Sequence, residues 1–273
     1  MGISEAQILD DLANDKLTFP TLPEVAIRVR DSIAQEDVSV KEVSDVIETD
    51  PVLAGRIIQV ANSALYRGAR AIENVNMAVG RLGLNTVRNL ATSLVMKQLF
   101  QATHPVIDTY LRELWEISTN VAALACALAS IVKLDKDTAM LAGLVHAIGV
   151  SPILLEAEND PEMMVNTLAL DNFLMAVYPT VSAKILQSWD FPAELITVSA
   201  EHLTFTRDAP SADYTDLITV ALLQTVAGTK HPLAATDLST VNAFERLGMP
   251  TDIEQIELQG HAEIADEIKQ AIA

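Results

Sequence analysis

The sequence is poor in the residues that build disulfide-linked or β-rich proteins. It contains one cysteine, Cys126, which excludes an intramolecular disulfide and favours a reducing compartment. Ten glycines and eleven prolines are too few for a turn-rich all-β protein. Aromatic residues make up 4% of a chain that is 50% hydrophobic. Ala, Leu, Val and Ile must therefore fill the core, which favours closely packed helices.

Signals for export and for membrane insertion are also missing. Residues 1–6 show no basic region followed by an apolar one, so no signal peptide is expected. The longest apolar run, residues 121–132, covers 12 residues, which is too short to cross a bilayer. No Gly-rich phosphate loop of the P-loop or Rossmann type occurs, and no cofactor is expected. We therefore expect a cytoplasmic protein without a membrane partner.

Positive charge is scarce, except in one segment. The net charge of −19 repels phosphate backbones and argues against a nucleic-acid partner. Between residues 56 and 97, however, the only acid is Glu73, against six basic residues: Arg56, Arg67, Arg70, Arg81, Arg88 and Lys97. These groups either pair with acids on other helices or form a surface for an anionic ligand or acidic partner. The candidate binding residues are Arg67, Arg70, Arg81 and Arg88.

Local helix signals dominate the first third of the chain. Ser39 and Glu42 have the spacing of a capping box. Asp50 is a good N-cap, and Pro51 fits the first position of the next helix. Asn62 and Ser63 follow this helix, where their side chains can bond to free backbone groups. We interpret these four residues, 50, 51, 62 and 63, as structural. Asn74 caps a short helix that stops near Gly83.

Helical periodicity continues to the C-terminus. A long helix is predicted to begin at Asp108 or Thr109, and Asp135 to cap a helix that contains His146 and ends at Gly149. Further helices are predicted over residues 179–189, 192–202, around 217–224 and 241–247, and 253–272. No alternation long enough for a strand occurs, so the fold class is all-α. A soft boundary near residues 101–108 predicts two helical halves, residues 1–103 and 104–273, in one compact unit.

One stretch has the layout of a metal site that lacks a ligand. Residues 141–150, LAGLVHAIGV, match a helix carrying an adjacent His-Asp pair, but Ala147 occupies the Asp position after His146. Imidazole and carboxylate together hold a divalent ion that activates water, and alanine offers no lone pair. His146 alone cannot hold a metal ion. Its simplest interpretation is a hydrogen-bonded imidazole in the core.

Four ordered motifs resemble the HDOD domain of bacterial signalling proteins. They are FPTLPEV (residues 19–25), DPVL (50–53), ANSALY (61–66) and NVNMAV (74–79), followed by Leu82-Gly83. The resemblance covers residues 18–206 and is looser in the C-terminal helices. It implies a multi-helix bundle in which an N-terminal helical half packs on a degenerate half related to HD-type metal phosphohydrolases.

The resemblance also predicts which ligand positions are altered. The usual histidine after the matching Trp115 is Ile117, the Asp is Ala147, and the downstream His is Tyr178. Donor atoms remain only at His146, Glu201 and His202. A three-ligand site from these residues is the less favoured hypothesis, because a solvated helix end explains Glu201 and His202. Cys126 lies in an apolar run and is interpreted as a small buried hydrophobe.

Two functional hypotheses follow. The favoured one is a non-catalytic signal-transduction module that binds a protein of a signalling pathway or a small anionic ligand, with no catalytic residues and no metal. The alternative is a residual metal-dependent phosphohydrolase acting on a nucleotide or phosphoester. The missing ligands at positions 117, 147 and 178 argue against the alternative.

Overall fold

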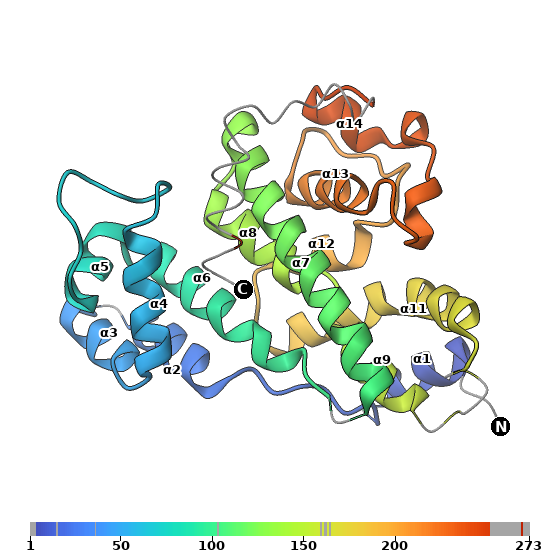
Figure 1. Cartoon of the computed structure of the whole chain (residues 1–273), viewed down its shortest axis with the longest axis horizontal. Helices are drawn as coiled ribbons and strands as arrows, with labels where there is room; N and C mark the ends of the chain where they lie inside the picture. The colour runs from blue at the N-terminus through green and yellow to red at the C-terminus, as the bar shows by residue number, and fades with distance from the viewer. Residues whose placement is uncertain are drawn as a thin grey trace.

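The computed structural model describes residues 4–251, except residues 15, 36, 103, 159, 161, 162 and 164, together with Lys269. Within these residues the fold is all-α and contains no strand, as the sequence predicts (Figure 1). The predicted helix over residues 253–272 lies almost entirely outside the described residues. The division at residue 103 stays a prediction.

The first part of the chain forms a small bundle beside the rest of the molecule. Its helices are α2 (Glu24–Ile33), α3 (Val40–Ile47), α4 (Pro51–Ala61), α5 (Val75–Leu82) and α6 (Leu84–Val95). Helix α6 packs against both α2 and α8 and so connects this bundle to the second part (Figure 1). Helix α1 (Glu5–Ala13) lies apart from the bundle and packs against α11.

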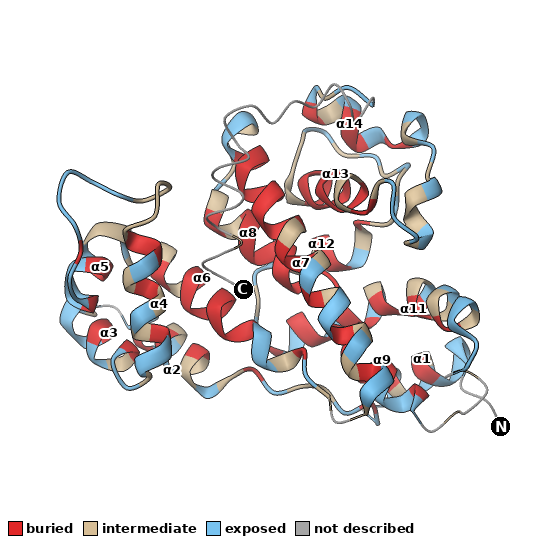
Figure 2. Ribbon diagram, in the orientation of Figure 1, coloured by how far each residue is buried: buried red, intermediate tan, exposed pale blue. Residues whose placement is uncertain are grey.

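The second part forms a larger helical unit. Its members are α7 (Pro105–Val132), α8 (Lys136–Val145), α9 (Val150–Ala157), α11 (Thr167–Ser188), α12 (Ala193–Glu201), α13 (Tyr214–Val226) and α14 (Asn242–Leu247). Helices α7 and α8 make the most extensive pairing, and α13 packs on both. Figure 2 shows continuous burial along the C-terminal half of α7 and along α8 and α13. Small side chains make this possible, since residues 121–129 of α7 are all buried.

The predicted caps are confirmed. Ser39 and Glu42 form the capping box of α3. The Asp50 carboxylate accepts hydrogen bonds from the backbone N–H groups of Val52 and Leu53, and Pro51 is the first helical residue. Asn74 caps α5 in the same way. These side chains satisfy backbone donors that have no partner inside the helix.

Three predicted helix limits are wrong. Helix α7 begins at Pro105 instead of Asp108 or Thr109, because the fixed φ of proline suits the first position and Asp108 N–H already bonds to the His104 carbonyl. Helix α11 begins at Thr167 and runs through Pro179. Helix α8 ends at Val145, so His146 caps it and Gly149 lies beyond it.

Two glycines allow helices to approach closely. Gly149 lies beyond the end of α8, and its φ of −65° is not left-handed. A Cβ there would lie 2.5 Å from the Ser182 nitrogen on α11. A Cβ on Gly143 would fall on the backbone of Ala122. These close approaches position the end of α8 tightly between α7 and α11.

One buried carboxylate joins the two parts. Asp137, in the first turn of α8, accepts hydrogen bonds from the hydroxyl of Tyr66 and from Thr86 Oγ1, the latter at 2.7 Å. Lys136 Nζ lies 4.1 Å above the Tyr66 ring. Burial is the main cause of the raised pKa of Tyr66, and the Asp137 charge adds to it. Tyr66, the last residue of the ANSALY motif, therefore joins the bundle to α8.

Two segments are long and apolar enough to cross a membrane by composition alone. They cover residues 105–132 and 136–157, and their most apolar windows are 67% and 89% buried inside the molecule. Burial of this kind is typical of core helices. The absence of a membrane partner stays a prediction.

Candidate functional site

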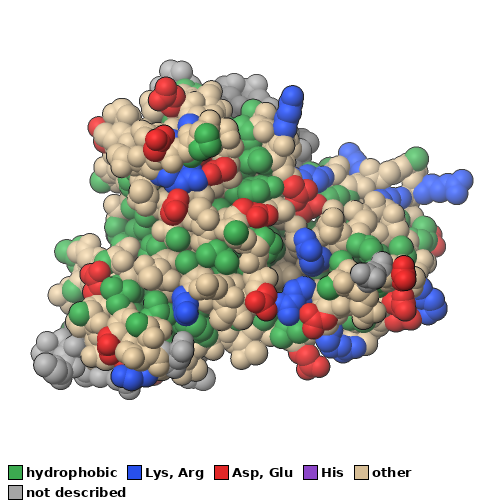
Figure 3. All heavy atoms as spheres, turned by 180° about the vertical axis from the view of Figure 1, so that it is seen from behind, with side chains coloured by type: hydrophobic (Ala, Val, Ile, Leu, Met, Phe, Trp, Pro, Cys, Tyr) green, Lys and Arg blue, Asp and Glu red, His purple; other side chains and the backbone are tan. Residues whose placement is uncertain are grey.

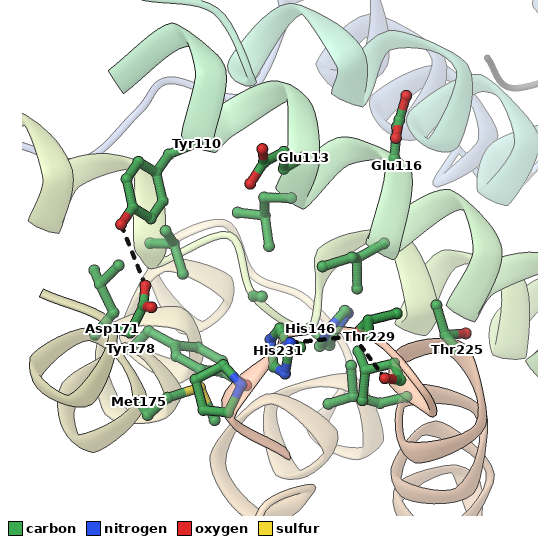
Figure 4. Close-up of a pocket in the computed structure, with 18 of the residues that line it drawn as sticks. Tyr110, Glu113, Glu116, His146, Asp171, Met175, Tyr178, Thr225, Thr229 and His231 are labelled. Atoms are coloured by element: carbon green, nitrogen blue, oxygen red, sulfur yellow. Dashed lines mark hydrogen bonds between the residues drawn. The ribbon is translucent and has the colours of Figure 1, made fainter. Parts of the chain in front are cut away.

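A cavity of about 530 Å³ lies at the altered ligand positions. Helix α7 contributes one face to it, since the lining residues of this helix recur at helical spacing: Tyr110, Glu113, Leu114, Glu116, Ile117 and Asn120. The remaining walls come from one face of α11, the end of α13 and the loop over residues 229–232. We call His146 and Ala147, which directly follow the last residue of α8, the floor of the cavity. Figure 4 shows His146.

His146 on the floor contacts a second neutral histidine, His202, which is packed behind it. His146 is 1% exposed, and its Nδ1 lies 2.7 Å from the Gly143 carbonyl oxygen. Because a carbonyl only accepts, Nδ1 carries the proton and Nε2 keeps a lone pair that no hydrogen bond within the described residues uses. The ring meets that of His202 edge to face at 5.2 Å. Burial lowers the pKa of His146 to about 4.

His202 has no free ring nitrogen. Its Nδ1 donates to the Val198 carbonyl at 2.9 Å, so Nε2 must accept the hydroxyl proton of Tyr178, 2.7 Å away. Burial, then the neighbouring His146, lowers the pKa of His202 to about 3. Burial also raises the pKa of Tyr178, so both partners stay neutral. The interpretation of His202 as part of a solvated helix end is therefore wrong.

The cavity has one acidic end. The Tyr110 hydroxyl lies 3.3 Å from Asp171 Oδ1 and donates to it across the gap between α7 and α11. Glu113 lies beside them on α7, whereas Glu116 points away from the centre of the cavity (Figure 4). Burial and the nearby Asp171 and Glu113 raise the pKa of Tyr110 to about 12. Negative charge thus gathers on one side of an otherwise largely apolar space.

His231 lies over the floor from the opposite loop. It is near His146 in Figure 4, and its Nδ1 accepts the Leu233 N–H at 3.2 Å. The proton of the neutral ring is then on Nε2. Burial lowers its pKa, against the opposing effect of Asp171.

The three positions at which the resemblance expects metal ligands lie together. Ile117, Ala147 and Tyr178 all line the cavity together with His146. Two of them carry no donor atom, and Tyr178 donates its only proton to His202. The described residues contain no group of three or more His, Cys, Asp or Glu that could hold a metal ion. The donor set therefore does not fit the metal centre of an HD-type hydrolase.

Glu201 does not join the two histidines. Its carboxylate accepts a hydrogen bond from Arg207 Nε at 2.8 Å. Arg207 also pairs with Asp213 and Asp216, and Arg246 with Asp216. Glu201 thus belongs to an ion-pair network that ties α12, α13 and α14 together.

The basic residues of the first part divide into two kinds. Arg67 and Arg70 are exposed on the loop after α4. Arg81, by contrast, donates to the carbonyls of Ala61 and Arg70 and so fixes that loop. Arg88 is half-buried. In the view from behind, Lys and Arg side chains are frequent over the bundle, with acidic groups among them (Figure 3).

Asn62 has the structural role that the sequence predicts. Its amide donates to the carbonyls of Ile58 and Ile72 and accepts the Ile72 N–H, closing the loop. The Ser63 carbonyl accepts from the N–H groups of Tyr66 and Arg67. Cys126 is 1% exposed, as predicted, and burial raises the pKa of its thiol to about 12.

Sequence reasoning missed Tyr110, Glu113, Asp171 and His231. Tyr110 and Glu113 precede Ile117 at helical spacing. This spacing places them on the same face of α7 as Ile117 and could have identified them. Asp171 lies seven residues before Tyr178 on the same helix, which offers a similar signal. Nothing local marks His231, because only the packing of the loop after α13 brings it to the cavity.

These features define an all-α protein whose cavity lies at the positions that the resemblance assigns to metal ligands. The family model of the HDOD domain matches residues 19–205. The chain belongs to the HDOD family, and the predicted resemblance is confirmed.

Known proteins resemble the chain to different degrees. A provisionally named metal-dependent phosphohydrolase from Shewanella amazonensis SB2B has a solved structure that is 34% identical, covers 98% of both chains and gives a TM-score of 0.87. An HDOD domain protein of unknown function from Geobacter sulfurreducens shares the fold at 19% identity and a TM-score of 0.64, over 97% of this chain and 99% of its own. An uncharacterized protein from Treponema pallidum is 24% identical over 219 residues, which cover 74% of this chain and 39% of that protein.

Proposed function

We propose that the chain is a non-catalytic regulatory module that acts by binding a protein or a small ligand. The observation that carries the proposal is the donor set of the cavity floor. Of the two histidines at this place in the described part of the chain, only His146 keeps an unused ring nitrogen, Nε2, since His202 is bonded on both nitrogens. A single neutral imidazole does not hold a catalytic divalent ion.

The absence of metal-binding donors also removes the usual means of activating water. Metal-dependent hydrolysis requires an ion that lowers the pKa of bound water. Ile117 and Ala147 fill two ligand positions with carbon. The cavity that remains is lined largely by apolar side chains with a few polar groups, which is the general form of a small-molecule binding site.

The alternative function is a residual metal-dependent phosphohydrolase. The name of the Shewanella protein, 34% identical to this chain, favours it. It requires metal ligands that this chain lacks at positions 117, 147 and 178. Regulation by binding requires none of them and is therefore the better supported function.

Metal analysis and a hydrolysis assay separate the two functions. We expect protein purified without chelator to contain substoichiometric zinc, manganese and iron, and to hydrolyse bis(p-nitrophenyl) phosphate no faster than buffer with added Mn²⁺. His146→Ala is the matched control, because activity from a contaminant would survive it. About one tightly bound ion per chain, or turnover, lost in His146→Ala would overturn the proposal.

A further inference from the structure

We propose that the cavity binds a small organic cation with an apolar body and a hydrogen-bond donor at the end remote from its charge. The inference deepens the proposed function and rests on it. It differs from the phosphoester ligand that a hydrolase ancestry would imply. The cavity supplies three features that together define this chemistry.

The first feature is an apolar middle. A volume of about 530 Å³ is within the range of small-ligand sites. Ile117 from α7, Leu174 from α11 and Val226 from α13 line it from three sides. These walls favour a ligand with a hydrocarbon or aromatic body.

The second feature is the sign of the charge. Among the described lining residues, Glu113 and Asp171 lie at the acidic end and Glu116 points away from the centre, whereas Lys230 is the one charged base. The two lining histidines have lowered pKa values and are neutral at pH 7. A phosphate would therefore meet net repulsion, whereas a cation is attracted.

The acidic end has the geometry to receive an ammonium group. Asp171 uses one oxygen for the Tyr110 hydroxyl, 3.3 Å away, and keeps further acceptor capacity. Glu113 lies on the same side of the cavity (Figure 4). An ammonium group between these carboxylates gains charge-assisted hydrogen bonds and can contact the face of the Tyr110 ring.

The third feature is an unused acceptor at the floor. His146 is 1% exposed and lines the cavity, and its Nε2 lone pair has no partner in the described part of the chain. Polar atoms of buried side chains are normally hydrogen-bonded. A ligand that donates a proton there satisfies the atom, while its cationic end remains at Glu113 and Asp171.

Matched indole probes test the proposal by titration calorimetry. Tryptamine carries an ammonium, an apolar ring and an N–H donor. Indole-3-propionate replaces the ammonium by a carboxylate, and 1-methyltryptamine removes the ring donor. We expect tryptamine to bind at least about tenfold more tightly than indole-3-propionate and more tightly than 1-methyltryptamine. Equal binding of tryptamine and the acid, or displacement of tryptamine by inorganic phosphate, would overturn the proposal.

Variants locate the binding. The double variant Glu113→Gln, Asp171→Asn should weaken tryptamine binding by about tenfold or more and leave the neutral analogue tryptophol unaffected. Glu156→Gln with Glu158→Gln is the matched control, since it removes the same charge from exposed positions outside the cavity. Equal losses in both double variants would show a general charge effect and would contradict the proposed site. Circular dichroism of every variant establishes that the fold is retained.

The hydrolysis assay on the same preparations keeps the two proposals distinguishable. Turnover that depends on His146 refutes the regulatory function. Without such turnover, a failure of tryptamine to bind preferentially refutes only the ligand class.

Discussion

Tyr178 changes the chemistry of the floor through a single hydroxyl. The resemblance places a histidine at this position, which would offer a lone pair to a metal ion. The tyrosine hydroxyl instead gives its proton to His202 Nε2 at 2.7 Å. Position 178 thus carries a hydrogen-bond donor in place of a metal ligand. His202, which accepts this bond, is a core residue with both ring nitrogens hydrogen-bonded.

Removing that hydroxyl should be costly. Tyr178→Phe leaves a buried ring nitrogen of His202 without a partner, and we expect the free energy of unfolding to fall by about 1–3 kcal/mol. Urea denaturation measures the change. Tyr110→Phe is the control, because its half-buried hydroxyl makes only a 3.3 Å bond and should cost less. Equal losses of unfolding free energy in the two variants would show that the hydrogen bond from Tyr178 to His202 contributes no more to stability than the bond from Tyr110 to Asp171.

The histidine pair predicts how stability depends on pH. The folded-state pKa values of His146 and His202, about 4 and about 3, lie below the ordinary value of 6.5. Between these values the unfolded chain binds more protons than the folded one. The contribution of the two neutral histidines to stability is therefore fully present above pH 6.5 and is lost as the pH falls toward 4 and 3.

This loss can be assigned to the histidines by substitution. Urea titrations from pH 7.5 to pH 4.5 should show a falling free energy of unfolding, and His146→Gln should reduce its slope. The variant introduces a group that does not titrate in this range. A slope unchanged by the substitution would mean that other groups, such as the carboxylates paired with Arg207, dominate the acid response.

At the scale of the element, the start of α4 provides a test of local capping. Asp50→Ala removes the acceptor for the Val52 and Leu53 N–H groups, so we expect a loss of roughly 0.5–2 kcal/mol in stability. Asp50→Asn keeps a comparable acceptor and should lose much less. Thermal and urea unfolding of both variants measure the difference. Similar losses would mean that charge, and not the cap, stabilises the helix.

Helix limits could be predicted where a local interaction sets them. Asp50, Asn74 and Asp135 each bond to a backbone N–H within three residues, and each was identified from the sequence. The prediction of a helix start at Pro179 is wrong. Its neighbours Tyr178 and Val181 are buried, and this packing keeps α11 helical despite the lost backbone bond.

The candidate site was predictable only in part, for a related reason. Positions 117, 146, 147 and 178 could be identified because motif spacing along the chain marks them. The bond between Tyr178 and His202 could not, since it joins residues 24 positions apart on different helices. The same applies to Glu201, whose partner Arg207 follows in an irregular loop. Long-range pairing of side chains needs the packing as well as the pattern.

At the scale of the whole molecule, the exposed arginines of the bundle predict steering of an acidic partner. Arg67 and Arg70 lie on one loop of a chain with a net charge of −19. Inverting both to Glu should reduce recovery of native partners in co-purification from the host while the fold stays intact. For the unaltered protein, the association rate should fall with added salt.

A charge-matched variant controls this prediction. Arg112→Glu with Lys184→Glu inverts two exposed basic residues on α7 and α11. Partner recovery should be unaffected by it. Unchanged recovery in the Arg67, Arg70 variant would remove the evidence for a functional surface, and a loss of stability there would favour structural pairing.

Helix α8 gives the molecule a mechanical connection. Its first turn carries Asp137, which is hydrogen-bonded to Tyr66 and Thr86 of the bundle, and its last residue directly precedes His146 on the cavity floor. Ten helical residues form a stiff rod about 15 Å long. A shift of His146 on the floor would therefore be transmitted through α8 to Asp137. A shift of the bundle at Tyr66 or Thr86 would be transmitted in the opposite direction. If ligand binding in the cavity moves α8, it changes the affinity of the bundle for its partner. Thermodynamic reciprocity then requires that the partner change the affinity of the cavity for its ligand by the same factor.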